Sequence, residues 1–306
     1  MQREGRPDAP PGSISVAMVT SDEADKVVEA LESVSWADEV VVLDLQSKDG
    51  SPDVARAHGA VVHTRPPHPV VEPLRDEVAN LCFGEWVLVL DPDERVSPGL
   101  ARALRLAGTR DDIDAVVVPR MNIDFGSAPE SPVHRYESQL RMYRRSQVSW
   151  PHFPNSLPKV DESRLLRLPR DDEHVLLHER NRNVAEAADR LMRYAPAEAQ
   201  AMRDRGDTFS AAEMWRTLRT QFERQVIEAR AWEEGVPGLV RAGILVNHKF
   251  FVWVAFWQLS GGGRTSGDDI VVRRLGVILR GLGVLARSRR RIGAVKRGWG
   301  TLRAFR

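Results

Sequence analysis

Three clusters of acidic residues lie in the first third of the chain, and each directly follows a short apolar run. They are residues 20–23 (TSDE), 44–50 (DLQSKDG) and 91–94 (DPDE). One such cluster would be an ordinary solvated turn, because Asp, Ser and Gly are common turn residues. Three at one edge of a sheet would form an anionic pocket that a cation must neutralise. A divalent ion, Mg²⁺ or Mn²⁺, held by carboxylates and by the phosphates of a nucleotide diphosphate meets this need.

The segments around these clusters predict alternating strands and helices. Strands are expected at residues 14–19, 39–43, 60–63, 85–90 and 114–118, and helices at 25–34, 51–58, 72–82 and 97–106. Strands that alternate with helices of about ten residues join by right-handed crossovers into a mostly parallel sheet. Ligands of such α/β sheets bind beyond the carboxyl ends of the strands, where the acidic clusters are expected.

Residues 13–107 resemble the family 2 glycosyltransferases, which have the GT-A fold, a Rossmann-like, mostly parallel sheet flanked by helices. The resemblance rests on the motifs at residues 14–23, 36–51 and 84–97, with the DPDERVS ending, and on Arg75. The branch most similar is that of the lipopolysaccharide-core glucosyltransferases. The resemblance implies an inverting transfer of sugar from a nucleotide-diphosphate sugar, a UDP-sugar by preference, to a cell-envelope glycan or a lipid-linked acceptor.

The resemblance also implies roles for individual residues. Asp44 matches the aspartate that contacts the nucleoside. Asp91 and Asp93 match the pair that faces the ribose, the metal and the diphosphate, with Asp93 as the more direct metal ligand. Arg75 matches an arginine suited to phosphate or sugar oxygens, and an ion pair with an acidic neighbour on its own helix is the alternative. The other residues expected to bind the nucleotide sugar are Thr20, Asp22, Glu23, Ser47 and Asp49.

The motifs do not supply the base that an inverting transfer needs to take the proton of the acceptor hydroxyl. In the family, a Val-His-Glu element follows a strand that residues 139–145 resemble, but residues 150–159 contain no His-Glu pair. His152 is the nearest candidate, with Asp161 and Glu162 behind it. His178 matches a family position at the start of the later helices, with a structural or acceptor-side role.

Two alternative functions remain open. The missing pair allows a catalytically impaired GT-A domain that serves as a binding or scaffold subunit at a membrane. A sugar-1-phosphate nucleotidyltransferase would share the nucleotide-sugar pocket. Such enzymes usually carry a glycine-rich loop after the first strand, and residues 20–23 contain no glycine.

The second half of the chain is basic and includes the most apolar stretch. Residues 126–306 hold 32 Lys and Arg against 20 Asp and Glu, whereas residues 1–125 hold 12 against 23. Within residues 239–259, Arg241 and Lys249 interrupt the apolar sequence. Two cations are costly in a membrane span, so a helix in the membrane interface or a buried core helix is favoured over a transmembrane helix.

The last residues of the chain, 270–306, hold 11 basic side chains and no acidic one. We expect an amphipathic segment on anionic lipid, with a solvated or disordered tail and a nucleic-acid patch as alternatives. Nucleic acid is the weakest of these, because the chain shows no helix-turn-helix, finger or aromatic stacking platform.

Four segments are therefore expected: a disordered leader (1–12), a GT-A catalytic domain that binds the nucleotide sugar (13–172), a helical acceptor-side and membrane-proximal region (173–269), and a basic amphipathic tail (270–306). The single cysteine, Cys82, excludes an intramolecular disulfide. The polar leader does not have the pattern of a signal peptide. We expect a cytoplasmic protein that attaches peripherally to the inner face of the cell membrane.

Overall fold

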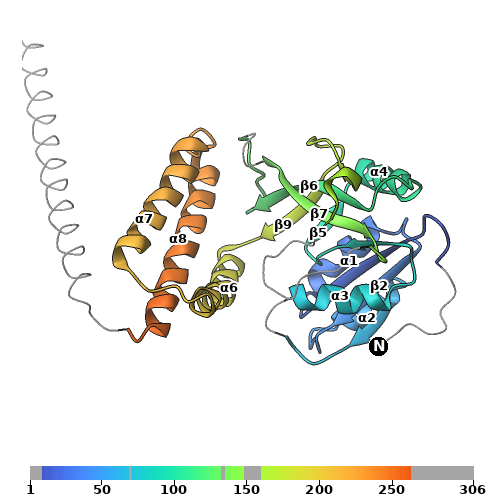
Figure 1. The fold of residues 1–306 in the computed structure, drawn as a ribbon, viewed down its shortest axis with the longest axis horizontal. Coiled ribbons are helices and arrows are strands. Elements are labelled where there is room, and N and C mark those ends of the chain that lie inside the picture. The colour runs from blue at the N-terminus through green and yellow to red at the C-terminus, as the bar shows by residue number, and fades with distance from the viewer. Residues whose placement is uncertain (1–8, 69–70, 132–134, 148–159, 263–306) are drawn as a thin grey trace, which may run out of the picture. The chain divides into compact units, whose positions relative to one another are not determined.

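The computed structural model describes residues 9–68, 71–131, 135–147 and 160–262, and it divides the chain into two compact units (Figure 1). Unit 1 comprises residues 1–184 and unit 2 comprises residues 185–306. The basic tail and most of the leader lie outside the described residues, so the predictions made for them stay predictions.

Unit 1 is built on one sheet of nine strands, in the order β3-β2-β1-β4-β7-β6-β9-β5, with β8 beside β6. The strands are β1 (Ile14–Thr20), β2 (Glu39–Asp44), β3 (Val61–Thr64), β4 (Trp86–Val89), β5 (Glu94–Val96), β6 (Ala115–Asp124), β7 (Glu137–Arg144), β8 (Leu165–Arg167) and β9 (Leu176–Asn181). Pairing is antiparallel where β7 meets β4 and β6 and where β5 meets β9, and parallel elsewhere. The expected α/β fold with a mostly parallel sheet is confirmed.

Helices cover both faces of this sheet. Alternate residues of β1 point to opposite sides, so Val16 and Met18 pack with α1 (Ala24–Ser33), α2 (Ser51–Ala57) and α4 (Pro98–Gly108), whereas Ala17 and Val19 pack with α3 (Glu72–Leu81). Strands that are buried on both faces consist of continuous apolar runs, which is why β1, β2 and β4 are recognisable in the sequence.

Strand β9 extends the sheet domain beyond the boundary predicted from the sequence. The sequence prediction ended this domain at residue 172, in a polar loop. The structure places residues 176–181 between β6 and β5 in the sheet, so the domain extends to about Val184. The prediction was wrong because β9 has only six residues, of which four are polar or charged, and it therefore lacks the apolar run of a buried strand.

Unit 2 is helical in its described part, with α6 (Val184–Asp204), α7 (Ala211–Phe222), a π-helical segment (Glu223–Glu228) and α8 (Gly235–Leu259). Ser210 caps α7 by accepting a hydrogen bond from the backbone of Glu213, as the capping-box pattern predicts. Trp253 and Phe256 of α8 pack on Ala199 of α6. Residues 231–259 are long and apolar enough to cross a membrane, judged by length and composition only.

Replacing Trp86 by alanine should lower the free energy of unfolding by about 3–5 kcal/mol, because it empties a large buried site. The Trp86 side chain is fully buried, and its indole N–H donates to the backbone oxygen of Gly108 at 3.0 Å. Leu106→Ala is the control, since Leu106 is 71% exposed and should change stability by less than about 0.5 kcal/mol. Urea denaturation followed by circular dichroism measures both, and equal losses would contradict the assigned core.

Candidate functional site

The structure brings the three acidic clusters to one edge of the sheet. Thr20 and Asp44 are register partners at the ends of β1 and β2, and Asp91 lies two residues beyond the end of β4. Because β1 lies between β2 and β4, the three strand ends are neighbours. This is the edge at which open α/β sheets bind their ligands.

Hydrogen bonds tie the first cluster to the second. Three backbone N–H groups of the first cluster donate to side chains of the second: Asp22 to Ser47 Oγ at 2.9 Å, Glu23 to Ser51 Oγ at 2.9 Å and Ala24 to Asp49 Oδ2 at 2.8 Å. In the other direction, the backbone N–H of Lys48 donates to Asp22 Oδ1 at 2.6 Å. Burial raises the pKa of Asp49, but its hydrogen bonds from Ala24 and Ser51 outweigh burial and hold the pKa below its usual range. The side chains of Asp22, Ser47 and Asp49 therefore shape the rim of the site.

Thr20 and Asp44 keep unused hydrogen-bonding capacity at the base of this rim. Their exposed fractions are 1% and 2%. Asp44 Oδ2 accepts from the backbone of Ser47 at 3.2 Å, whereas Asp44 Oδ1 and Thr20 Oγ1 have no hydrogen-bond partner in the part of the chain that the structure describes. Leaving a buried polar atom unpaired costs about 1–3 kcal/mol, which a polar ligand at this edge would offset.

Arg141 of β7 lies beneath the third cluster. Its Nη2 lies 3.0 Å from Asp91 Oδ2 and also contacts the fully buried carboxylate of Glu94. Glu94 Oε1 lies 3.3 Å from Arg120 Nη1, and Asp91 Oδ1 lies 3.6 Å from Arg75 Nη2. Burial raises the pKa of Asp91, but the charges of Arg141, Arg75 and Arg120 outweigh it and hold the pKa well below its usual range.

The expectation that Asp91 shares the metal with Asp93 stays a prediction, and the structure shows what competes with the metal for Asp91. Both carboxylate oxygens of Asp91 face guanidinium groups, and a divalent cation added there would be repelled by Arg75 and Arg141. Arg75 does reach the site, since it lies beside Asp91.

Asp93 faces a histidine. Asp93 Oδ2 lies 3.3 Å from His178 Nε2, and His178 Nδ1 lies 2.6 Å from Asn122 Oδ1. An amide oxygen only accepts hydrogen bonds, so Nδ1 donates to it and Nε2 is turned toward the carboxylate. At this distance, a carboxylate oxygen and an imidazole lone pair repel each other unless a proton or a metal ion lies between them.

The donor set at Asp93 fits a divalent ion that a substrate completes. Adjacent ligands of an octahedral ion with bonds of about 2.1 Å lie about 3 Å apart, close to the spacing of Asp93 and His178. Among the described residues, no group of three or more His, Cys, Asp or Glu side chains is arranged to hold a metal ion. Asp93 and His178 could supply two ligands to a divalent ion, and substrate oxygens or water could supply the others.

The structure places Asp161 and Glu162 away from this edge. Both precede β8, which pairs with the start of β6 at Ala115. Asn122, which orients His178, lies seven residues further along β6 (122 − 115), roughly 20 Å away at strand spacing. The expectation that Asp161 and Glu162 act as bases is corrected, because nearness in sequence to residue 152 does not bring them to the site. His152 lies outside the described residues.

The sequence prediction gave His178 a structural or acceptor-side role and did not place the pair His178-Glu179 at the site. It sought a His-Glu pair at residues 150–159, but His178 and Glu179 stand in β9, beside the third cluster. His178 is the register partner of Glu94, and the backbone N–H of Glu179 donates to the backbone oxygen of Asp93 at 2.9 Å. Glu179 is partly exposed. The dipeptide was a visible signal, but only the pairing of β5 with β9 shows that it reaches the site.

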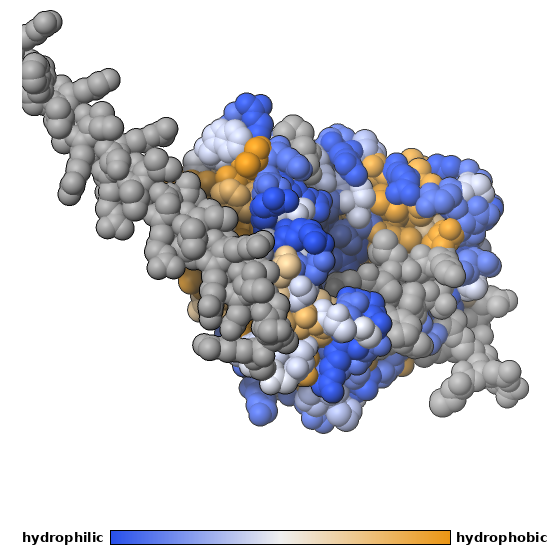
Figure 2. Space-filling view, turned by 60° about the vertical axis from the view of Figure 1, so that its left-hand side comes forward, coloured by the Kyte–Doolittle hydropathy of each residue, from blue (hydrophilic) through white to orange (hydrophobic). Residues whose placement is uncertain are grey.

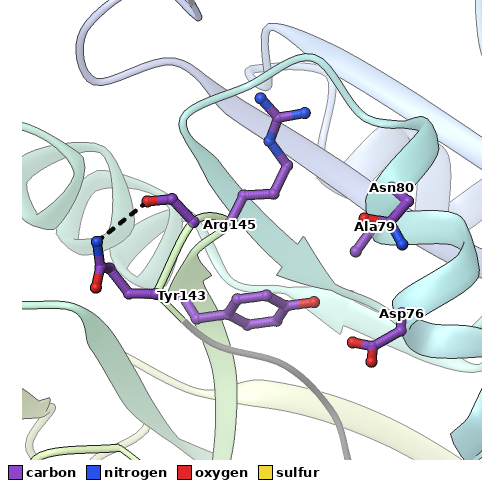
Figure 3. A pocket seen from close by; sticks show the side chains of 7 residues that line it. Asp76, Ala79, Asn80, Tyr143 and Arg145 are labelled. Carbon is purple, nitrogen blue, oxygen red and sulfur yellow. Dashed lines mark hydrogen bonds between the residues drawn. The ribbon is translucent and has the colours of Figure 1, made fainter. Parts of the chain in front are cut away.

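A polar pocket of about 260 Å³ lies elsewhere on unit 1, between α3 and the end of β7 (Figure 3). Its lining residues are Asp76, Ala79, Asn80, Tyr143, Arg145, Ser146 and Gln147. The backbone N–H of Arg145 donates to the backbone oxygen of Glu85 at 3.0 Å, which places the pocket near the start of β4. Asp91 follows the other end of β4, so this pocket is distinct from the candidate site.

Residues 15–160 match the model of the family described as glycosyl transferase family 2. A TPR repeat-containing protein of Synechococcus elongatus is 32% identical over 124 residues, which are 40% of this chain and 30% of that protein. An uncharacterized glycosyltransferase of Rickettsia felis is 34% identical over 88 residues, which are 28% of this chain and 31% of that protein. The chain thus matches about a third of the length of these relatives.

A solved structure with some similarity is that of the mannosyltransferase PcManGT from Pyrobaculum calidifontis in complex with GDP-Man and Mn²⁺. The TM-score is 0.43 and the sequence identity 16%, with 91% of this chain and 84% of that chain covered.

Replacing Arg141 by methionine should destabilise the protein by about 3–5 kcal/mol, because it leaves buried carboxylates without their counter-charge. Arg167→Met is the matched control: Arg167 forms an exposed ion pair with Glu162 at 2.9 Å, and its loss should cost less than about 1 kcal/mol. Guanidinium denaturation at neutral pH measures both variants. Similar losses would show that Arg141 does not have the buried role described.

Acid should narrow the gap in stability between the wild type and Arg141→Met. The Arg141, Arg75 and Arg120 charges hold the pKa of Asp91 in the folded state below its usual value of 3.8. The stability that this carboxylate contributes is therefore complete above about pH 4 and is lost as the pH falls further toward its folded pKa. Denaturation of both proteins at several pH values between 3 and 7 measures the gap, and a gap that widens in acid would contradict the pairing.

Proposed function

We propose that the protein is a nucleotide-sugar glycosyltransferase whose metal ion is held by Asp93 and His178, because residues 15–160 match the model of glycosyl transferase family 2. The observation that carries the metal site is the facing pair of Asp93 Oδ2 and His178 Nε2, 3.3 Å apart, at the edge where the acidic clusters meet. The proposed acceptor is a cell-envelope glycan or a lipid-linked acceptor, as the resemblance of the motifs implies.

Different residues of the site bind different parts of the nucleotide-sugar donor. Thr20 and Asp44, with their unpaired buried oxygens, receive the nucleoside. Arg75, beside Asp91, is a cation suited to bind the diphosphate. Asn122 orients His178 through Nδ1, so that Nε2 and Asp93 present two ligands to Mg²⁺ or Mn²⁺. When bound, the ion neutralises the charge that develops on the leaving diphosphate.

Among the described residues, Glu179 is an additional candidate for the catalytic base. Its backbone N–H donates to the backbone oxygen of Asp93, which brings the main chain of Glu179 beside the third cluster. No hydrogen bond or ion pair of its carboxylate occurs within the described part of the chain, which leaves the carboxylate available to take the proton of an acceptor hydroxyl in an inverting transfer. His152 stays a second candidate from the sequence.

The scaffold alternative is less favoured than catalysis. It rested on a missing His-Glu pair, and that pair is present in β9 as His178 and Glu179. A UDP-sugar remains the first donor to test. The proposed location is the cytoplasmic face of the cell membrane, a proposal supported by the basic second half of the sequence and by the apolar helix α8.

Nucleotide binding should depend on the metal and on Asp93 and His178. With Mn²⁺ and one nucleoside diphosphate at about a hundred times its Kd, the wild type should gain about 2.7 kcal/mol of stability. Thermal unfolding with UDP, GDP, ADP, CDP and dTDP, each with and without Mn²⁺, measures this gain. Asp93→Ala and His178→Ala should abolish the metal-dependent part of the gain.

The matched control for these two variants is Asp53→Ala, because Asp53 is an exposed carboxylate of α2 whose side chain is 83% exposed. It should respond to nucleotides as the wild type does. A folded wild type that responds to none of the nucleotides would favour the scaffold alternative over the transferase.

Glu179→Gln should slow sugar transfer by about 10²–10⁴-fold, the usual contribution of a general base, while nucleotide binding stays intact. Transfer is measured as release of nucleoside diphosphate from UDP-sugars in the presence of an envelope-lipid extract. Glu162→Gln, at the far end of β6, should leave both properties unchanged. If Glu179→Gln transfers sugar at the wild-type rate, the base is a different residue and His152 is the next to replace.

A further inference from the structure

Helix α8 of unit 2 carries apolar side chains on a face that the described residues leave exposed. The large exposed ones are Val236, Leu239, Val240, Phe250, Phe251 and Trp257, which are 37–72% exposed. At about 100° per residue, these six positions fall within an arc of about 120°, so they lie on one face of the helix. Between Val236 and Trp257, this face includes one exposed polar residue, Asn247, and no charged residue. We call this surface the α8 outer face.

The charged residues of α8 lie on its other side, where they are paired. Arg241 is buried and forms an ion pair with Glu234. His248 Nε2 and Lys249 Nζ each lie 2.7 Å from an oxygen of Glu198 of α6. A helix in water normally has the opposite arrangement, with its charges outward and its apolar residues packed inside. The distribution in α8 therefore indicates that its outer face does not meet water alone.

Unit 1 shows no comparable surface in its described part. Its large exposed apolar residues are Val61, Phe83, Leu106 and Val184, on different elements, and single residues of this kind are common on soluble proteins. In the space-filling view, hydrophobic side chains gather in separate areas between hydrophilic ones (Figure 2). The α8 outer face extends instead along a 25-residue helix.

We propose that the α8 outer face inserts into the interface of a lipid bilayer that contains anionic headgroups, with the axis of α8 parallel to the membrane plane. The proposal rests on the membrane location given under the proposed function and specifies which surface contacts the membrane. Phe250, Phe251 and Trp257 suit this depth, because aromatic side chains concentrate at membrane interfaces. Residues 270–306 follow α8 in the sequence with 11 basic and no acidic residues, a charge that complements anionic lipid.

The same contacts argue against a helix that spans the bilayer. His248 and Lys249 lie near the middle of α8 and are bound to Glu198, so a spanning α8 would carry these charges and part of α6 into the hydrocarbon. Charged groups at the centre of a bilayer are costly. With α8 parallel to the membrane, its charged side remains paired with α6, and only the outer face enters the lipid.

Vesicle flotation of the full chain tests the surface. Vesicles of phosphatidylcholine with a quarter phosphatidylglycerol should bind the wild type, and Val240→Glu combined with Phe251→Glu should reduce the bound fraction at least tenfold. The matched control is Val61→Glu combined with Leu106→Glu, at exposed apolar positions of unit 1, which should bind as the wild type does. Wild type that does not float, or equal behaviour of the two double variants, would overturn the proposal.

A depth measurement distinguishes a parallel helix from a spanning one. Cys82 is buried, so a fluorophore attached to a new cysteine at position 240 or 251 reports that position. The two sites are eleven residues apart (251 − 240), about 16 Å along a helix axis. Quenchers at known depths in the bilayer should place both probes at the same shallow level. A difference on the order of 16 Å, or no quenching at either site, would overturn the proposal.

Nucleotide binding separates this proposal from the proposed function on which it rests. The Val240→Glu and Phe251→Glu variant should keep the metal-dependent stabilisation by nucleotide while it loses vesicle binding. If the wild type binds vesicles but responds to no nucleotide, the proposed transferase function is contradicted and the proposed lipid contact of the α8 outer face is supported. Loss of both properties in the variant alone would show that the α8 outer face is needed for folding, which counts against a lipid contact.

Discussion

One buried guanidinium, that of Arg141, holds the candidate site together. It contacts Asp91 and Glu94, two carboxylates of the same tight turn after β4. Glu94 also accepts a hydrogen bond from Arg120 of β6, so strands β5, β6 and β7 meet at its side chain. Removing one partner from such a buried group would leave uncompensated charge at a cost of about 3–5 kcal/mol. The position of β5, and through it that of β9, depends on this pairing.

The pairing also separates the two aspartates of the Asp-Pro-Asp motif, although they are only two residues apart. Asp91 forms ion pairs with Arg141 and Arg75. Asp93 is turned toward His178, whose ring is fixed by Asn122 of β6. Because β9 lies between β6 and β5, the same hydrogen-bonded strands that build the sheet bring the histidine to the aspartate.

Buried or partly buried charges are paired in both units, with different consequences for the structure. In unit 1, the buried charges of Arg141 and Glu94 are paired with each other. In unit 2, His248 and Lys249 are likewise paired with Glu198, and burial raises the pKa of Glu198 while these two partners outweigh burial and lower it to about 2. Since the charges of α8 are used in this packing, its uncovered face is left with apolar side chains. That face is a consequence of how the helices pack, and no composition of the helix alone predicts it.

The sequence by itself determined the first half of the sheet and the edge that carries the site. Strands β1, β2 and β4 are apolar runs, and residues that follow parallel strands must meet at one edge, so Thr20, Asp44 and Asp91 could be placed together without a structure. The tertiary structure alone decided which groups complete that edge. Arg141, Asn122 and His178 come from strands far away in sequence, whose pairing is set by long-range hydrogen bonds. For the same reason Asp161 and Glu162, near His152 in sequence, lie at the other end of β6, whereas Glu179, more distant in sequence, lies beside Asp93.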